Sequence, residues 1–142
     1  MSKIVCYLTK IARCGGQYRN RRLEPWGIRA QQAGLLLEIC ATPGISQDAL
    51  ARRVFLDKSV VARALANLEE QGLVERPTCQ KDRRVIRLHP TEKALQLQPR
   101  LQAVSDQWAQ HLTAGMTPEE LAALDALLTR LQERAAQWED AE

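Results

Sequence analysis

The sequence predicts a mostly α-helical (α+β) protein of about six helices with a small sheet of two to three strands. Aromatic residues make up only 4% of the chain, while Leu, Ala and Gln recur in runs typical of helices. Apolar residues return every three or four positions in most segments, and two short alternating segments flank a charged stretch near residue 80. A chain of 142 residues can bury one core, so a single domain over residues 1–142 is expected.

Two helices are predicted in the first third of the chain. Apolar residues at helical spacing predict a first helix over residues 1–24, namely Ile4, Leu8, Ile11 and Tyr18. The glycines at 15–16 weaken this helix in its middle. The segment "RAQQAGLLLEICA" predicts a second helix, which ends at Thr42-Pro43-Gly44 because proline and glycine stop a helix.

A pair of short helices follows in "ISQDALARRVFLDKSVVARALANLEEQGLVER", joined by a tight turn near Phe55-Leu56. Ser46 and Asp57 are predicted to cap them, since their side chains can accept from the free N–H groups of a first turn. In the second helix, the spacing predicts a buried stripe of Val61, Leu65 and Leu68, with Ala64 beside it. Small and polar residues fall on the opposite face, namely Ser59, Ala62, Arg63, Ala66 and Asn67.

A charged hairpin is predicted after this helix. Gly72 is placed to end the helix, and "LVERPT" and "RVIRLH" alternate as strands do. The loop between them carries "KDRR", which adds little to stability as surface charge. The cluster is therefore interpreted as a contact surface, with a solvated turn as the alternative.

Two more helices are predicted at the end of the chain. Helical spacing runs from Thr91 to about Leu112, where Pro99 is expected to kink the helix or to mark its true beginning. The segment "TPEE" predicts a capping box, with Thr117 as N-cap, Pro118 next and Glu120 as its reciprocal partner. Apolar residues then alternate in steps of three and four, which requires a partner helix: Leu121, Leu124, Leu128, Leu131, Ala135 and Trp138.

The residue pattern argues against an enzyme, a metal site or a bound cofactor. His89 and His111 lie apart, no serine or cysteine has a recognisable neighbouring base, and no phosphate-binding glycine loop is present in the sequence. The four cysteines, Cys6, Cys14, Cys40 and Cys79, include no CxxC pair and indicate neither a zinc site nor a disulfide framework. No apolar run approaches the roughly 20 residues of a membrane span, so a cytoplasmic protein is expected.

Charge is distributed unevenly along the chain. Lys and Arg minus Asp and Glu give 7 − 2 = +5 for residues 1–45, 9 − 6 = +3 for residues 46–90 and 4 − 9 = −5 for residues 91–142. Residues 46–90, with a net charge of +3, contain the helix with the small polar face. Such a face suits the major groove of B-DNA, because short side chains allow close approach while Ser59, Arg63 and Asn67 can meet base edges.

Residues 45–94 resemble the winged helix-turn-helix of the MarR family of bacterial transcriptional regulators. The most specific pieces are "DKSVVARALANLEEQGLVER" and the wing "DRR" followed by "TEKA". The resemblance implies a homodimeric, double-stranded DNA-binding regulator, expected to be a repressor on a pseudo-palindromic operator. It further implies that residues 1–24 and 95–142 form intertwined dimerisation helices and that residues 28–94 form the DNA-binding region.

The resemblance also implies roles for individual residues. It makes residues 57–71 the recognition helix, and Arg84 the wing arginine of the minor groove, aimed by Asp82. The predicted DNA contacts are Ser46, Gln47, Lys58, Ser59, Val60, Ala62, Arg63, Asn67, Lys81, Asp82, Arg83 and Arg84. Three positions depart from the family pattern and bear on the geometry of the wing, namely Pro90, Ala94 and Cys79.

Regulators of this family respond to a small aromatic or phenolic ligand or to thiol oxidation, and both alternatives stay open. The candidates for binding such an effector are Arg22, Trp26, Gln31 and Trp108, although Trp26 also fits a plain core residue. Cys6 is the candidate for oxidation, because it lies on the first helix near Lys3 and Lys10. An alternative function is a winged-helix protein-interaction module that does not bind DNA specifically.

Overall fold

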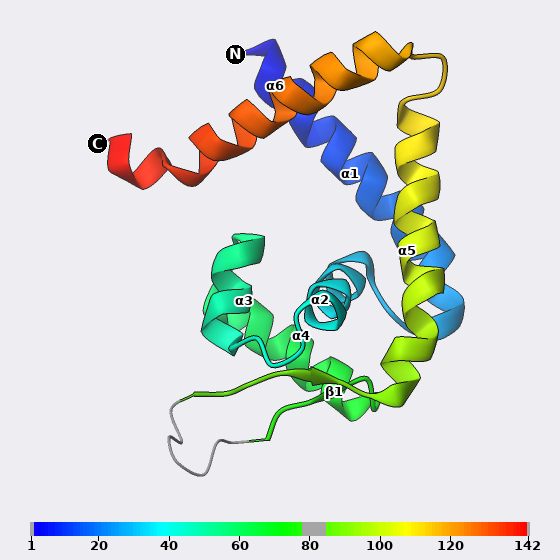
Figure 1. The fold of residues 1–142 in the computed structure, drawn as a ribbon, viewed down its shortest axis with the longest axis vertical. Coiled ribbons are helices and arrows are strands. Elements are labelled where there is room, and N and C mark those ends of the chain that lie inside the picture. The colour runs from blue at the N-terminus through cyan, green and yellow to red at the C-terminus, as the bar shows by residue number, and fades with distance from the viewer. Residues whose placement is uncertain (1, 78–84, 142) are drawn as a thin grey trace. The chain divides into compact units, whose positions relative to one another are not determined.

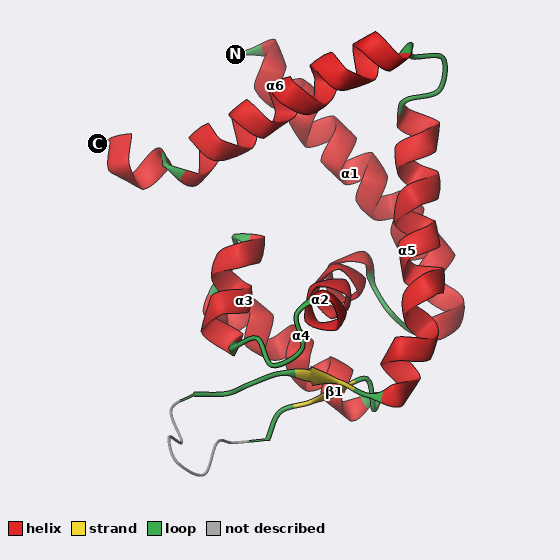
Figure 2. Cartoon of the chain, in the orientation of Figure 1, coloured by secondary structure: helices red, strands yellow, loops and turns green. Residues whose placement is uncertain are grey.

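The computed structural model describes residues 2–77 and 85–141. These residues form six α-helices and a small antiparallel sheet, which confirms the predicted fold class (Figures 1 and 2). The chain divides into two compact units, residues 1–108 and 109–142. The helix α5 continues from the first unit into the second.

The first unit contains every element up to the greater part of α5. Its helices are α1 (Lys3–Leu23), the 3₁₀-helix η1 (Glu24–Trp26), α2 (Ala30–Ala41), α3 (Gln47–Val54), α4 (Lys58–Glu70) and α5 (Glu92–Leu112). Its strands are β1 (Val74–Glu75) and β2 (His89–Pro90). The predicted helices therefore all form, and α1 continues through the glycines at 15–16.

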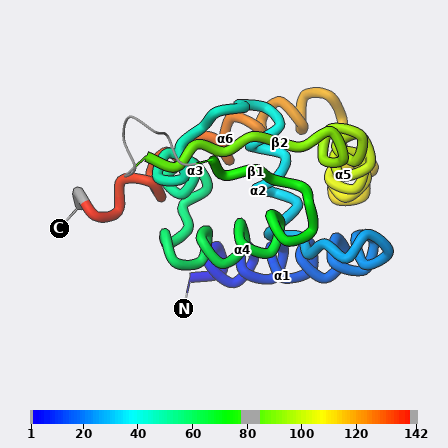
Figure 3. The backbone as a smooth tube through the Cα atoms, turned by 90° about the horizontal axis from the view of Figure 1, so that it is seen from below, coloured from blue at the N-terminus to red at the C-terminus, as the bar shows by residue number. Residues whose placement is uncertain are grey.

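The core of this unit is built around α2. This helix contacts α1, α3, α4 and β2, and its Leu35, Leu36 and Ile39 are at most 1% exposed. Leu50 of α3 and the predicted stripe of α4 are equally buried around it, since Leu50, Val61, Leu65 and Leu68 are all 0% exposed. Burying one such side chain contributes roughly 1.5–3 kcal/mol. The helix pair α3–α4 is therefore held by packing on α2 (Figure 3).

The two predicted helix caps have different outcomes. The Ser46 hydroxyl accepts a hydrogen bond from the Ala49 N–H at 3.1 Å, which confirms Ser46 as the cap of α3. Asp57 stands at the N-cap position of α4 but its side chain makes no capping bond, so that part of the prediction is wrong. The turn between the helices places Phe55 in the left-handed region at φ 56°, where a bulky residue is rare.

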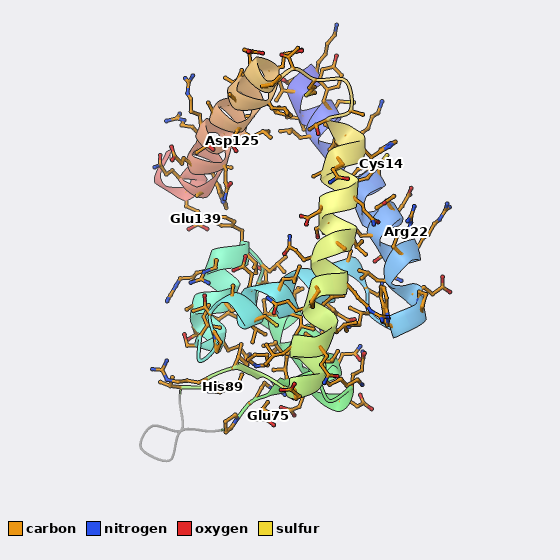
Figure 4. All side chains as sticks on the ribbon, turned by 45° about the vertical axis from the view of Figure 1, so that its right-hand side comes forward. Cys14, Arg22, Glu75, His89, Asp125 and Glu139 are labelled. Carbon is orange, nitrogen blue, oxygen red and sulfur yellow. The ribbon has the colours of Figure 1, made fainter. Side chains whose placement is uncertain are left out.

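The strands are shorter than predicted and pair partly with another segment. Val74 pairs with Pro90 and Glu75 with His89, the two residues labelled on the strands in Figure 4. Residues 86–88 instead bond to residues 45–47 at the start of α3, through Gln47 N–H to Ile86 O at 2.9 Å and Leu88 N–H to Ile45 O at 2.9 Å. Ser46 and Arg87 form the bridge between these segments. The second predicted strand therefore pairs with two segments, β1 and the start of α3.

The start of α5 is fastened to the end of α4. Thr91 donates its hydroxyl to Gly72 O at 2.7 Å and accepts from the Ala94 N–H at 3.2 Å. Lys93 Nζ donates to Gln71 O, the C-cap of α4, at 2.8 Å. Pro99 lies inside α5, so of the two predicted alternatives it does not mark the true beginning of the helix.

One close approach fixes α1 against α5. A Cβ atom at Gly15 would lie 2.8 Å from Trp108 Nε1, so only glycine fits there without displacing the indole. Trp108 also packs on Tyr18, with ring centroids 5.1 Å apart. At Gly16, by contrast, an added Cβ would meet nothing within 4 Å.

The second unit contains the end of α5, then α6 (Pro118–Ala136) and the 3₁₀-helix η2 (Trp138–Ala141). The predicted capping box is confirmed, since Thr117 Oγ1 accepts from the Glu120 N–H and Glu120 Oε1 accepts from the Thr117 N–H, both at 3.1 Å. No residue of α6 is buried. None of the described helices combines the length and the apolar character needed to cross a membrane.

The two adjacent glycines of α1 give a matched test of its packing on α5. Gly16→Ala should raise the free energy of unfolding by about 1 kcal/mol, because alanine favours a helix and meets no obstacle. Gly15→Ala should lower it by about 1 kcal/mol, because losing the Tyr18–Trp108 packing and shifting the indole outweigh the same helical gain. Urea unfolding followed by circular dichroism measures both; equal stabilisation by the two variants would contradict this account.

Candidate nucleic-acid interface

The outward face of α4 is exposed and carries mostly short side chains, as the sequence predicts. Ser59, Arg63, Ala66 and Asn67 are exposed, and Ala62 is half-buried. Val60 is also half-buried, on the flank of the helix that turns towards α1 and α2. Because the opposite side of α4 is fixed in the core, this outer face is held as a rigid surface.

The polar side chains of this face differ in whether they already make hydrogen bonds within the protein. Asn67 Oδ1 accepts from Gln71 Nε2 at 3.1 Å, which leaves the amide N–H groups of Asn67 to donate elsewhere. Arg63 has no hydrogen bond or ion pair with any residue that the structure describes. Its guanidinium is therefore available to an anionic or acceptor group.

The predicted contacts around α3 lie in more constrained positions. The Ser46 hydroxyl already serves as the cap of α3. Gln47 Oε1 is buried and has no hydrogen-bond partner among the described residues. Lys58 Nζ lies 3.5 Å from Asp48 Oδ1, and both side chains are mostly exposed, so this pair is weak and readily exchanged.

The wing carries the rest of the predicted contacts. Lys81, Asp82, Arg83 and Arg84 lie outside the described residues, as does Cys79. What is described is the base of the wing, where Arg87 donates from Nη1 to Gly44 O at 3.1 Å. Together with the Ser46–Arg87 bridge, this contact joins the base of the wing to the segment before α3.

A groove of about 780 Å³ borders the recognition helix candidate α4 on its Val60–Asn67 flank. Its other walls come from α1, from α2 and from the end of α3 with the following turn. Arg19 of α1 and Arg29, just before α2, line it together with Arg63. The sequence analysis missed Arg19 and Arg29, because no local motif signals residues that only the tertiary fold assembles.

The four candidate effector residues do not form one cluster. Arg22 lies over the Tyr18 ring at 4.7 Å from its centroid, and Tyr18 packs on Trp108, so Arg22 and Trp108 share one aromatic cluster on α1 and α5 (Figure 4 labels Arg22). Trp26 packs against the core elsewhere, with Arg100 over its ring at 5.8 Å. Gln31 lines the groove beside α4.

The described thiols are Cys6, Cys14 and Cys40, and all three are free. Cys6 is half-buried on α1, whereas Cys14, labelled on the same helix in Figure 4, is exposed. Burial raises the pKa of the Cys40 thiol, which lowers its thiolate fraction and its reactivity at neutral pH. Among the described residues, no group of three or more His, Cys, Asp or Glu side chains is arranged to hold a metal ion.

Comparisons with known proteins agree with this geometry. A model of the MarR family matches residues 26–85. The chain is 29% identical to the HTH-type transcriptional regulator YybA of Bacillus subtilis, over 98% of this chain and 93% of that protein. A crystal structure of MarR is 30% identical with a TM-score of 0.85, covering 96% of this chain and 92% of that one. A Listeria monocytogenes protein crystallised with a 26mer DNA is 27% identical with a TM-score of 0.91, covering 96% and 91%. The chain therefore belongs to the MarR family of transcriptional regulators.

Proposed function

We propose that the protein is a sequence-specific double-stranded DNA-binding regulator, acting as a homodimeric repressor in the cytoplasm, where its DNA would lie. The observation that carries this proposal is the exposed face of α4, which has small residues and an Arg63 with no partner among the described residues, on a helix whose other side is fixed in the core. The Listeria monocytogenes relative was crystallised with a 26mer DNA, which supports a duplex as the partner. A binding role of this kind assigns the protein no catalytic step.

In this proposal α4 reads the major groove. Ala62 and Ala66 allow close approach, and Ser59, Arg63 and Asn67 donate to base edges. Lys58, Val60, Ser46 and Gln47 would lie at the edge of the contact. The wing residues from Lys81 to Arg84 keep the roles that the family resemblance implies, with Arg84 in the minor groove, where negative potential attracts a guanidinium.

Replacing Arg63 tests base reading by α4. Arg63→Ala should weaken binding to the preferred duplex by about 1–3 kcal/mol and relax the base preference at one position of each half-site. Its stability should remain near that of the wild type, because Arg63 makes no intramolecular bond with any described residue. Selection from a random duplex pool followed by fluorescence anisotropy measures both effects. An unchanged base preference would remove Arg63 from the reading surface.

The alternative is a protein-interaction module that does not bind DNA specifically. The two functions differ in the salt dependence of duplex binding, since phosphate contacts release counterions and make log K fall linearly with log salt. A regulator should show both a steep slope and a preferred sequence. An interaction module should show neither.

The homodimer is proposed on two apolar surfaces. At the start of α1, several apolar side chains are exposed, namely Ile4, Val5, Tyr7, Leu8 and Ile11. On α6 and η2, much of the predicted seam is exposed as well, with Leu121 at 39%, Leu128 and Leu131 at 45% and Trp138 at 63%. Apolar surfaces of this extent are typical of interaction sites, and a second copy of the chain would cover them. Residues 1–24 and 95–142 are accordingly proposed as the dimerisation region, and residues 28–94 as the DNA-binding region.

Charge placed in the α6 seam tests the homodimer. Leu124→Lys combined with Leu131→Lys should abolish the dimer, because two ammonium groups per chain would be buried without partners. Analytical ultracentrifugation at micromolar concentration should show the wild type as a dimer and the variant as a monomer. Asp125→Lys, at an exposed position of the same helix that does not belong to the predicted seam, serves as the charge control (Figure 4). A monomeric wild type would refute the proposal.

Release from DNA is proposed to follow either a small aromatic or phenolic effector or oxidation of Cys6. The aromatic cluster with Arg22 and Trp108 supports an effector, because a guanidinium beside an aromatic ring can hold a phenolate or carboxylate. Cys6 supports oxidation only through its place on α1 and its basic neighbours in sequence, Lys3 and Lys10.

Peroxide treatment separates these two signals. If Cys6 is the sensor, peroxide should release DNA from the wild type but leave the Cys6→Ser variant bound, because serine cannot form a sulfenic acid. Cys14→Ser is the matched control, since Cys14 is the more exposed thiol of the same helix. Equal behaviour of the wild type and the Cys6→Ser variant, by gel shift, would leave a non-covalent effector as the signal.

A further inference from the structure

The groove beside α4 has an excess of positive charge. Its charged residues are Arg19, Arg29, Arg63 and Glu38. Glu38 lies 3.4 Å from Arg53 Nη1, on the neighbouring helix α3, so its negative charge is already matched by an arginine that does not line the groove. The three arginines of the groove therefore lack an acidic partner among the described residues.

The walls of the groove hold these arginines in defined places. Ala30 N–H donates to Asn20 Oδ1 at 2.7 Å, which fastens the start of α2 to α1. Gln32 Oε1 accepts from the Arg29 N–H at 3.1 Å and fixes the backbone that carries Arg29. Arg19 donates from Nε to Gly15 O at 3.2 Å, and its terminal nitrogens have no acceptor among the described residues. Guanidinium groups that are held in place and still have unused donors can bind an oxyanion.

The position of the groove indicates which oxyanion reaches it. A helix lying in the major groove, about 12 Å wide, has a phosphate backbone along each flank. Arg63 and Asn67 belong both to the outward face of α4 and to the lining of this groove. Since Arg19 and Arg29 stand on that flank, outside the helix-turn-helix, they would meet the phosphates of the strand that passes there.

We propose that the groove between α1, α2 and α4 receives backbone phosphates of the bound duplex, with Arg19 and Arg29 as their ligands. The inference rests on the proposed function and deepens it, because it adds a contact that neither the recognition helix nor the wing supplies. Contacts to phosphate carry no base information but set the register of the protein on DNA. The dimerisation helix α1 would thus touch the DNA directly.

The test uses the full-length protein and the duplex that it retains from a random pool. Arg29→Ala and Arg19→Ala should each weaken binding about three- to tenfold at a given salt concentration, flatten the slope of log K against log salt by about one unit and leave the preferred sequence unchanged. Arg29→Lys should recover most of the affinity. Arg100→Ala removes an equal charge from α5, which does not border the groove, and serves as the matched control.

Neutral phosphate analogues then locate the contact. Single methylphosphonate replacements along the duplex should weaken the wild type at one or two positions, and at those positions Arg29→Ala should lose nothing further. If Arg29→Ala and Arg19→Ala both bind like Arg100→Ala, the groove does not hold phosphate and this inference is overturned while the proposed function stands. A wild type with no salt-dependent, sequence-selective binding overturns the proposed function, and the inference with it.

Discussion

The burial of α2 is the interaction on which the described DNA-facing geometry depends. Leu35, Leu36 and Ile39 are buried on α2, and this helix contacts α3, α4 and β2, so a shift of α2 would move three elements together. The ion pair and hydrogen bond from Arg53 to Glu38 and Thr42 add a polar tie between α3 and α2 at the rim of this packing. Exposed contacts of that kind are weak, and the apolar burial supplies most of the stability.

Local patterns predicted the helices and the two faces of α4, because helical period and helix caps depend on residues within one turn. Val61, Leu65 and Leu68 are buried as their spacing indicates, and Ser46 caps α3. Asp57 fails as a capping side chain although its position is right, since the residue type allows a cap without requiring one. The six helices, including α6 with its capping box, follow from signals of this range.

Contacts between residues far apart in the sequence were not predicted. Residues 86–88 pair with residues 44–47, about 40 positions earlier, where the sequence shows no strand alternation. The close approach of Trp108 to Gly15 and the groove lined by Arg19, Arg29 and Arg63 likewise join residues from separate elements. The glycine pair at 15–16 predicted a weakened helix, whereas in the fold Gly15 allows Trp108 of α5 to approach α1 closely. Candidate effector residues chosen by type alone were accordingly divided among three places.

Energetics connects the proposed interface with the proposed dimer. One recognition helix offers only a few base contacts, each worth about 1–3 kcal/mol, whereas specific DNA complexes reach dissociation constants of about 10⁻⁸ to 10⁻¹¹ M. Two half-sites read by two copies of α4 would supply that affinity, provided that the copies are spaced by about one turn of the duplex, roughly 34 Å. In the proposed dimer that spacing would be set by α1, α5 and α6 and not by α4 itself. A signal that changes the packing of those helices, such as an effector at the Tyr18–Trp108 pair, could therefore release the DNA without touching α4. If α1 also binds phosphate through Arg19, the same helix would link dimer geometry directly to DNA affinity.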